Sequence, residues 1–201
     1  MTIGSGRVPQ AMKNSSVRLA LTLGVVLFMV FAVQGCGDDK TTAQPMQFSA
    51  PQLQGSLEVP GNSSQGTGQF VMTVDPTQTS ANFTLNVSNL NNVFQAHLHM
   101  GAPGTNGAIF LWLYPQPTPQ TAGPANGGPT NGQIAFYTVH ASDLVGPMAG
   151  KTLADVVAAI QAGQVYVNVH TSGSGITSGQ PGNIPGGEIR QWLVQVNTTA
   201  K

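Results

Sequence analysis

Cysteine is nearly absent from this chain of 201 residues, which contains only Cys36. A single thiol can form no internal disulfide, so a domain built from this sequence must be held together by its core and its backbone hydrogen bonds alone.

Charged residues are also scarce: they make up 7% of the chain, against about a quarter in a typical soluble domain. Three of the seven basic residues precede Cys36, which leaves four basic residues against seven acidic ones in the rest of the chain. No basic patch is available for phosphates, so nucleic acid is a poor partner. The surface must be wetted by Asn, Gln, Ser and Thr, as suits an extracytoplasmic protein.

The chain lacks an apolar run long enough to span a bilayer. The uncharged stretch 19–33 has 15 residues, short of the roughly 20 that a spanning helix needs. Lys13 and Arg18 precede it, and Gly35-Cys36 come after it, which is the order of an export signal. A small residue before a lone cysteine resembles the lipobox of bacterial lipoproteins, in which the cysteine is lipidated. An uncleaved helix ending at an ordinary cysteine is the alternative.

These features predict a domain organisation. Residues 1–35 are a lipoprotein signal peptide, with Met1 or Met12 as the start; 36–47 are a polar tether, 48–196 a β domain and 197–201 a tail. The predicted location is the cell envelope, anchored to a membrane through lipid on Cys36, at the outer membrane or cell surface. A protein or matrix ligand outside the cytoplasm is the expected partner.

Beyond the tether, short runs with period two alternate with Gly, Pro and Asn clusters, which is typical of β-strands. About eight strands at this spacing predict an all-β sandwich or barrel. The runs are 48–49, 55–58, 69–74, 81–87, 94–100, 108–113, 132–139, 165–170 and 188–196. One short helix is expected after Thr152, because Asp155 completes a capping box and Gly163 provides a stop.

Three of the four histidines have similar surroundings. His97 and His99 are followed by a Gly-rich segment, and His170 ends an apolar run that is also followed by Gly-rich sequence. Residues two apart on a strand share a face, so His97 and His99 can bind one ion, with His170 as the third ligand of a copper or zinc site. His140 is interpreted as a loop residue.

Glu188 and Arg190 also share a strand face. Glu188 is a candidate acceptor behind the ligands that would fix one imidazole tautomer, or a structural partner of Arg190 or of a histidine. Two interpretations stay open. In the first, the histidines bind one metal ion; in the second, they bind Glu188 and loop carbonyls, and hold the Gly-rich loops against the barrel end. No catalytic residues are identified.

These residues carry a resemblance to the CHRD domain of chordin. The match covers about 48–192, and its segments are Phe48-Ser-Ala, Gly55-Ser-Leu-Glu58-Val59-Pro60, Gly66-Thr-Gly68, Ala96-His97-Leu98-His99, Gly101-Ala-Pro-Gly-Thr-Asn-Gly107, Ala162-Gly163, Tyr166-Val-Asn168-Val-His170-Thr171 and Pro185-Gly-Gly-Glu188-Ile-Arg190. The resemblance implies an immunoglobulin-like, Greek-key type of β-barrel and a binding or structural module without catalytic activity.

The chain departs from the family pattern in two places. Residues 172–184 are inserted between the His-Thr pair and the Pro-Gly-Gly-Glu segment, and Gln191-Trp192 replace the usual Gly-Gln. The insertion puts the proximity of His170 and Glu188 in doubt. A looser likeness to copper/zinc superoxide dismutases rests on the His-x-His pattern, but their disulfide cysteine and fuller ligand set are absent, so that enzyme activity is not expected.

Overall fold

The computed structural model describes residues 43–115, 123 and 126–196. The predicted signal peptide 1–35, Cys36, the first part of the tether and the tail 197–201 lie outside the described residues. Within them, no helix is long and apolar enough to cross a membrane. The β domain lies in the compact unit Thr41–Lys201.

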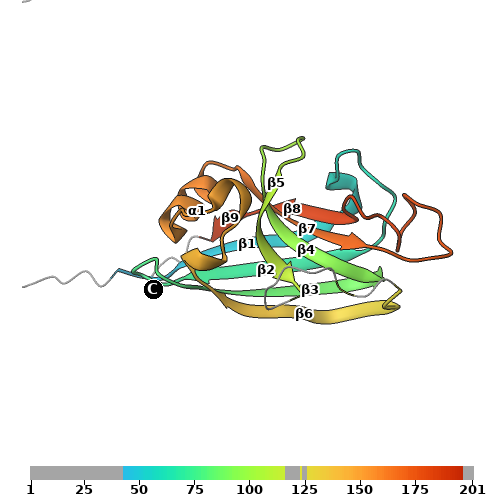
Figure 1. Ribbon diagram of the computed structural model, residues 1–201, viewed down its shortest axis with the longest axis horizontal. Coiled ribbons are helices and arrows are strands. Elements are labelled where there is room, and N and C mark those ends of the chain that lie inside the picture. Colours follow the sequence, from blue (N-terminus) through green and yellow to red (C-terminus); the bar gives the residue numbers. More distant parts are fainter. Residues whose placement is uncertain (1–42, 116–122, 124–125, 197–201) are drawn as a thin grey trace, which may run out of the picture. The chain divides into compact units, whose positions relative to one another are not determined.

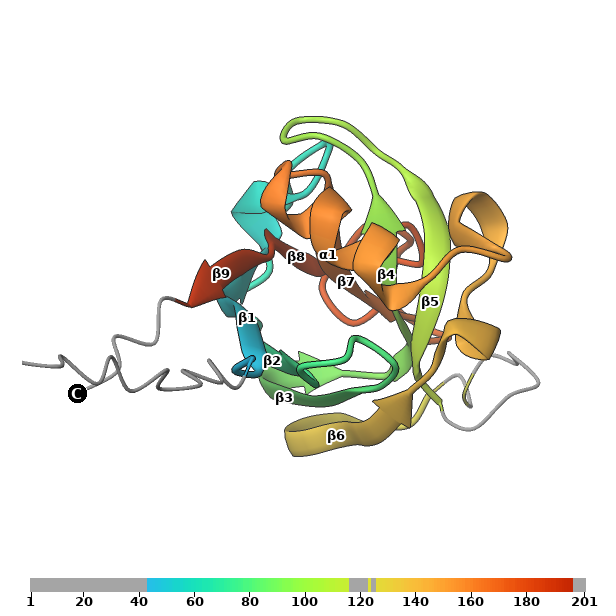
Figure 2. The same ribbon diagram turned by 90° about the vertical axis from the view of Figure 1, so that its left-hand side faces the viewer.

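Nine strands form one antiparallel sheet with the order β5-β4-β7-β8-β1-β2-β3-β6, and β9 pairs with β1 (Figure 1). The sheet curves until its edge strands β5 and β6 contact each other, which gives a nearly closed barrel (Figure 2). The all-β prediction is thus confirmed. The strands are β1 (Met46–Gln54), β2 (Thr67–Val74), β3 (Ala81–Asn91), β4 (Val93–Met100), β5 (Ala108–Tyr114), β6 (Pro129–Val139), β7 (Val165–Thr171), β8 (Ile189–Trp192) and β9 (Val194–Val196).

The alternation of the sequence determines which side chains fill the barrel. On β2, Phe70, Met72 and Val74 are buried, while the residues between them are partly exposed. Strand β7 departs from this pattern because all seven of its residues are buried. It lies between β4 and β8, and loops cover its outer face, so polar residues are enclosed there as well as apolar ones.

Two of the predicted strands are wrong in detail. Residues 55–58 do not extend the sheet: η1 (Gly55–Leu57) is a 3-10 turn, because the N–H groups of Glu58 and Asn62 both donate to the carbonyl of Gly55. The run 188–196 divides into β8 and β9 at Leu193, whose side chain is buried in the core and whose N–H donates to Val165.

The single α-helix of the described residues, α1 (Leu153–Gln161), matches its prediction. Thr152 and Asp155 form the capping box, and Gly163 has a φ of +69°, which lets the chain turn away. The helix buries one apolar face: Leu153, Val156, Val157 and Ile160. Two further 3-10 turns, η2 (Ala141–Asp143) and η3 (Gly146–Met148), precede it.

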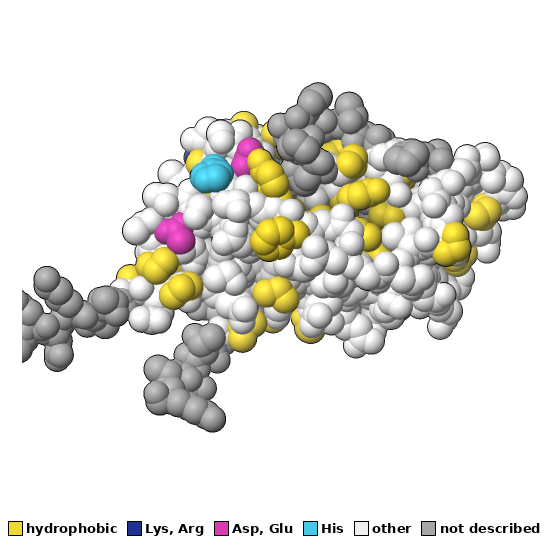
Figure 3. All heavy atoms as spheres, turned by 90° about the horizontal axis from the view of Figure 1, so that it is seen from below, with side chains coloured by type: hydrophobic (Ala, Val, Ile, Leu, Met, Phe, Trp, Pro, Cys, Tyr) yellow, Lys and Arg dark blue, Asp and Glu magenta, His cyan; other side chains and the backbone are white. Residues whose placement is uncertain are grey.

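The surface reflects the low charge of the sequence. Figure 3 shows a face on which neutral polar side chains and backbone predominate, with scattered hydrophobic groups and few charged ones. Such a face offers little electrostatic attraction to a charged macromolecule.

Candidate metal centre

The register of β4 and β7 places the three histidines on one patch of the outer face. His97 lies opposite Asn168, His99 lies opposite Tyr166, and His170 lies opposite Gln95. The intervening side chains point into the barrel, since they belong to the buried apolar core. The three imidazoles therefore come together outside the barrel wall, beneath the loops.

The rings are close enough to share one ion. His97 Nδ1 lies 3.1 Å from His170 Nε2. Choosing one nitrogen from each of His97, His99 and His170, all three ligand atoms lie within 4.8 Å of one another. The exposed fractions of the three residues are 0%, 7% and 6% in that order. Three convergent imidazole nitrogens of this kind suit zinc or copper.

Two main-chain carbonyls orient two of the rings. His99 Nδ1 lies 2.9 Å from the carbonyl oxygen of Gly107, and His170 Nδ1 lies 2.9 Å from that of Pro185. A carbonyl only accepts, so each Nδ1 must carry a proton and donate it. In a neutral ring the proton on Nδ1 leaves a lone pair on Nε2. Such carbonyl contacts are typical of metal-binding histidines.

The tautomers leave two buried lone pairs without partners. Because His170 Nε2 accepts, the Nδ1–H of His97 is its donor, and the lone pair of His97 moves to Nε2. His97 Nε2 and His99 Nε2 are both buried and have no hydrogen-bond partner in the described structure. A buried polar atom without a hydrogen-bond partner lowers the stability of the fold by about 1–3 kcal/mol. A ligand bound to these two nitrogens would remove that cost.

The surroundings keep the rings neutral. Burial lowers the pKa of His97 to about 2, and the neighbouring rings of His170 and His99 act in the same direction. Burial also lowers the pKa of His170 to about 4, against the contact with Pro185, which raises it. The pKa of His99 is lowered for the same first reason, burial. Neutral imidazole is the form that binds a metal ion.

Glu188 does not orient the histidine rings. Its carboxylate accepts from Ser64 Oγ at 2.6 Å, from the N–H of Gly182 at 2.8 Å, and from Thr171 Oγ1. The suggested Glu188–histidine contact is therefore corrected: loop donors occupy the carboxylate, and the carbonyls of Gly107 and Pro185 orient the rings. Glu188 ties three segments together beside the histidine patch.

Arg190 pairs with Glu58 rather than with Glu188. Its Nη2 lies 2.5 Å from Glu58 Oε2, and both side chains are almost fully buried. Burial raises the pKa of Glu58 to about 7, although Arg190 lowers it. The guanidinium also donates to Thr105 and Asn106 and stands 4.6 Å above the centre of the Tyr166 ring. Sequence reasoning missed Glu58, whose only signal was its place in the family segment 55–60.

Aromatic rings surround the histidines. Trp112 meets His97 edge-on with 4.4 Å between ring centres. Tyr166 stacks on His99 at 4.9 Å, and Trp192 contacts Tyr166 at 5.3 Å. The two tryptophans are the only ones in the chain. Sequence reasoning missed all three aromatics, although Tyr166 and His170 share the period-two face of one strand.

The Gly-rich loop after His99 has room for no side chain at Gly107. A Cβ built there would stand 1.8 Å from the carbonyl oxygen of Met100. This close approach lets the Gly107 N–H donate to Tyr166 Oη at 2.9 Å while its carbonyl accepts from His99. Glycine at 107 thereby fixes both a candidate ligand and the ring stacked on it.

The inserted segment 172–184 does not move His170 away from the Pro-Gly-Gly-Glu segment. The N–H of Ile184 donates to Thr171 Oγ1 at 3.0 Å, and the N–H of Glu188 donates to Val169 at 2.8 Å. The insertion therefore loops out between two fixed points, and Pro185 still reaches His170. His140 is exposed, and its N–H donates to Asp143 in the turn η2, as expected of a loop residue.

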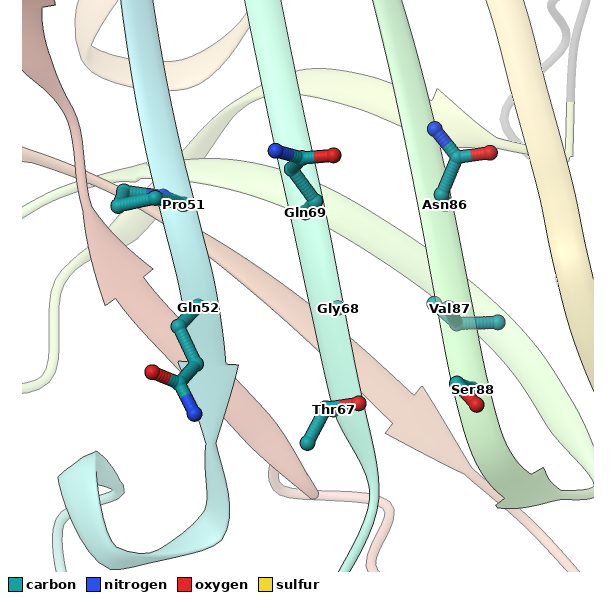
Figure 4. Close-up of a pocket in the computed structure, with 8 residues that line it drawn as sticks. All are labelled: Pro51, Gln52, Thr67, Gly68, Gln69, Asn86, Val87 and Ser88. Atoms are coloured by element: carbon teal, nitrogen blue, oxygen red, sulfur yellow. The ribbon is translucent and has the colours of Figure 1, made fainter.

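A hollow of about 340 Å³ lies elsewhere, over β1, β2 and β3 (Figure 4). Its lining includes Gln52, Gln69 and Asn86 and contains no titratable side chain. The strands that carry the histidines do not line it. The hollow therefore has no part in the candidate metal centre.

Fold and site together define a class: a small antiparallel β-barrel domain with a histidine cluster held under loops on its outer face. The family is the CHRD domain, whose model matches residues 48–190, and the chain belongs to it. This family is of the binding or structural kind rather than the catalytic kind. No curated protein and no solved structure matches the chain.

Proposed function

We propose that this CHRD domain is a metal-binding module that holds one copper or zinc ion on His97, His99 and His170. The observation that carries the proposal is the pair of buried, unpartnered Nε2 atoms on His97 and His99. Each belongs to a neutral ring with its lone pair free, and His170 supplies the third nitrogen nearby. One ion bound to the three residues would satisfy both unpartnered lone pairs.

A purely structural role explains the Nδ1 contacts of His99 and His170 but not the unpartnered Nε2 atoms of His97 and His99. His99 and His170 do tie the two Gly-rich loops to the sheet, each through its Nδ1. That role gives no reason for enclosing lone pairs that bind nothing. An apolar ring would fill the same space without the cost of an unsatisfied polar atom. In His99 and His170 the Nδ1 atom therefore fixes a loop, while the Nε2 atom of the same ring is the candidate metal ligand.

We further propose that the domain is displayed outside the cytoplasm on a lipid anchor at Cys36. The support is the sequence alone: the basic start, the 15-residue apolar run and the small residue before the lone cysteine. The low charge of the domain suits the same location. Within this proposal the protein is a non-catalytic module of the cell envelope, with the membrane as its first partner.

Elemental analysis tests the metal proposal. The full chain is purified in detergent without chelator or immobilised nickel, and the same is done for the His97→Ala/His99→Ala and His140→Ala variants. We expect about one copper or zinc ion per chain in the wild type and in His140→Ala, and none in the double variant. Absence of metal from the wild type, even after incubation with both ions, would overturn the proposal and direct the search to a protein or matrix ligand.

A further inference from the structure

The charge around the histidine cluster bears on which ion it selects. The three candidate ligands are neutral imidazoles, and no carboxylate or thiolate of the described residues belongs to the cluster. Two acidic side chains of the surrounding segments have other partners: Glu188 contacts Ser64 and Thr171, and Glu58 contacts Arg190. A bound ion would keep its full charge.

A fixed cation, the guanidinium of Arg190, lies near the patch. The guanidinium of Arg190 lies 4.6 Å from the centre of the Tyr166 ring, and that ring stacks on His99 at 4.9 Å. Arg190 and the candidate metal therefore stand on the same side of β7, separated by one aromatic ring and one imidazole. Glu58 offsets part of this positive charge, and the repulsion that remains is twice as large for a divalent ion as for a monovalent ion at the same place.

Burial of the site also favours a monovalent ion over a divalent ion. The histidines are at most 7% exposed, and Trp112 and Tyr166 pack against two of them. The cost of moving an ion from water into such a site grows with the square of its charge, so it is about four times larger for a divalent ion than for a monovalent ion of equal size. Zinc also needs a fourth ligand to complete a tetrahedron, whereas monovalent copper is stable with three.

We propose that the site selects monovalent copper over zinc and other divalent ions. This inference rests on the proposed function, since it names the ion that His97, His99 and His170 hold. Three neutral nitrogens, a nearby guanidinium and a wall of aromatic rings favour an ion of low charge and low coordination number. Imidazole is a ligand that copper accepts in both of its common oxidation states, so selectivity here comes from the charge and burial of the site.

Anaerobic competition titrations test this inference on the full chain in detergent. Copper(I) is titrated against a coloured copper(I) chelator, and zinc(II) against a zinc-binding dye, at pH 8. We expect copper(I) to bind more tightly than zinc(II). Zinc binding of equal or greater strength would overturn the selectivity and leave the metal-binding function standing. If neither ion binds, both proposals fall.

A charge variant tests the cause of the selectivity. Glu58→Gln removes the negative partner of Arg190 while keeping the size of the side chain and an oxygen that accepts from the guanidinium. We expect zinc(II) affinity to fall by a larger factor than copper(I) affinity, and His140→Ala to change neither. An unchanged ratio in a folded Glu58→Gln protein would contradict the role of Arg190. If that variant fails to fold, the ratio of the copper(I) and zinc(II) affinities of the wild type still tests the selectivity.

Discussion

His97 Nδ1 lies 3.1 Å from His170 Nε2, although 73 positions separate the two residues in the sequence. His170 Nδ1 donates to the carbonyl of Pro185, so His170 Nε2 accepts and the proton of His97 lies on Nδ1. The lone pair of His97 is therefore on Nε2, which is buried without a hydrogen-bond partner. This contact between two distant residues thus determines which nitrogen of His97 is left for an ion.

His97→Phe should separate metal binding from stability. Phenylalanine fills a similar space and removes the buried Nε2 that lacks a partner, while leaving His170 Nε2 unpaired in its place. The number of unsatisfied nitrogens stays the same, so we expect the free energy of unfolding of the metal-free protein to change by at most about 1 kcal/mol. Metal binding should be lost. Denaturant titration and elemental analysis of the same samples give both quantities.

The opposite pattern would identify a structural histidine. If His97→Phe costs several kcal/mol and the wild type holds no metal, the ring matters for packing alone. His140→Ala is the matched control, since His140 is exposed and lies outside the cluster. Neither its stability nor its metal content should change.

The metal-free domain should lose stability as the pH falls below about 6.5. In the unfolded chain the three histidines titrate near pH 6.5, whereas burial lowers the folded pKa of His97 to about 2 and that of His170 to about 4. Between these values the unfolded state binds more protons, so the free energy of unfolding falls with falling pH by up to about 1.4 kcal/mol per unit for each histidine.

Thermal or denaturant unfolding between pH 7 and pH 4.5 measures this dependence. Other groups titrate in the same range, so the comparison with His97→Phe isolates the contribution of one histidine. The variant should show a shallower dependence because one of the three sites is missing. Equal slopes would mean that His97 is not held neutral in the fold.

Replacing Arg190 with methionine should destabilise the domain most at alkaline pH. The change leaves Glu58 buried without its partner, and removal of one member of a buried ion pair costs about 3–5 kcal/mol. Burial raises the pKa of Glu58 to about 7 even though Arg190 lowers it. Without Arg190 the pKa is higher still, so the buried carboxyl takes up a proton as the pH falls and the cost becomes smaller. Unfolding measured at pH 8 and pH 6 should show the difference. A Glu58→Gln/Arg190→Met double variant, which keeps the histidines and lacks the carboxyl, is the control: the single variant should gain stability relative to it as the pH falls from 8 to 6.

Metal binding should change the intrinsic fluorescence of the protein. The chain has two tryptophans; Trp112 contacts His97, and Trp192 contacts Tyr166, which stacks on His99. Copper(I), added in the absence of oxygen, should quench the emission until about one equivalent is bound. Trp112→Phe should remove part of the response, and His97→Phe should remove all of it that saturates. A linear, unsaturable decrease in the wild type would indicate collisional quenching and no site.

The local parts of the fold and of the site can be predicted from the sequence, and the long-range parts cannot. The period of two places His97 and His99 on one face, and the capping box at Thr152 predicts α1, because both patterns depend on neighbours a few residues away. The carbonyls of Gly107 and Pro185 have no such signature. Every residue has a carbonyl, and only the folded loops bring these two to the histidines.

Partners far apart in sequence are the main source of error. The strand pattern suggests Glu188, two residues away, as a partner of Arg190, whereas the ion pair forms with Glu58, which lies 132 positions earlier. The short apolar pattern around Glu58 predicts a strand. The backbone instead turns at Gly55, because two later N–H groups converge on one carbonyl.

Cys36→Ser should release the protein from the membrane. The lipoprotein prediction rests on the order of basic, apolar and small residues before Cys36, and the modification would attach lipid to that thiol. One acyl chain gives only marginal membrane binding, and stable anchoring needs a second signal, so a chain that stays in the detergent phase should carry more than one acyl group.

Intact mass analysis of the wild type should find a chain that begins at Cys36 with added lipid, and the variant should lack that added mass. A wild-type chain that begins at Met1 or Met12 without lipid would contradict the anchor. The metal proposal would stand, since the histidine cluster is formed by residues of the β domain alone.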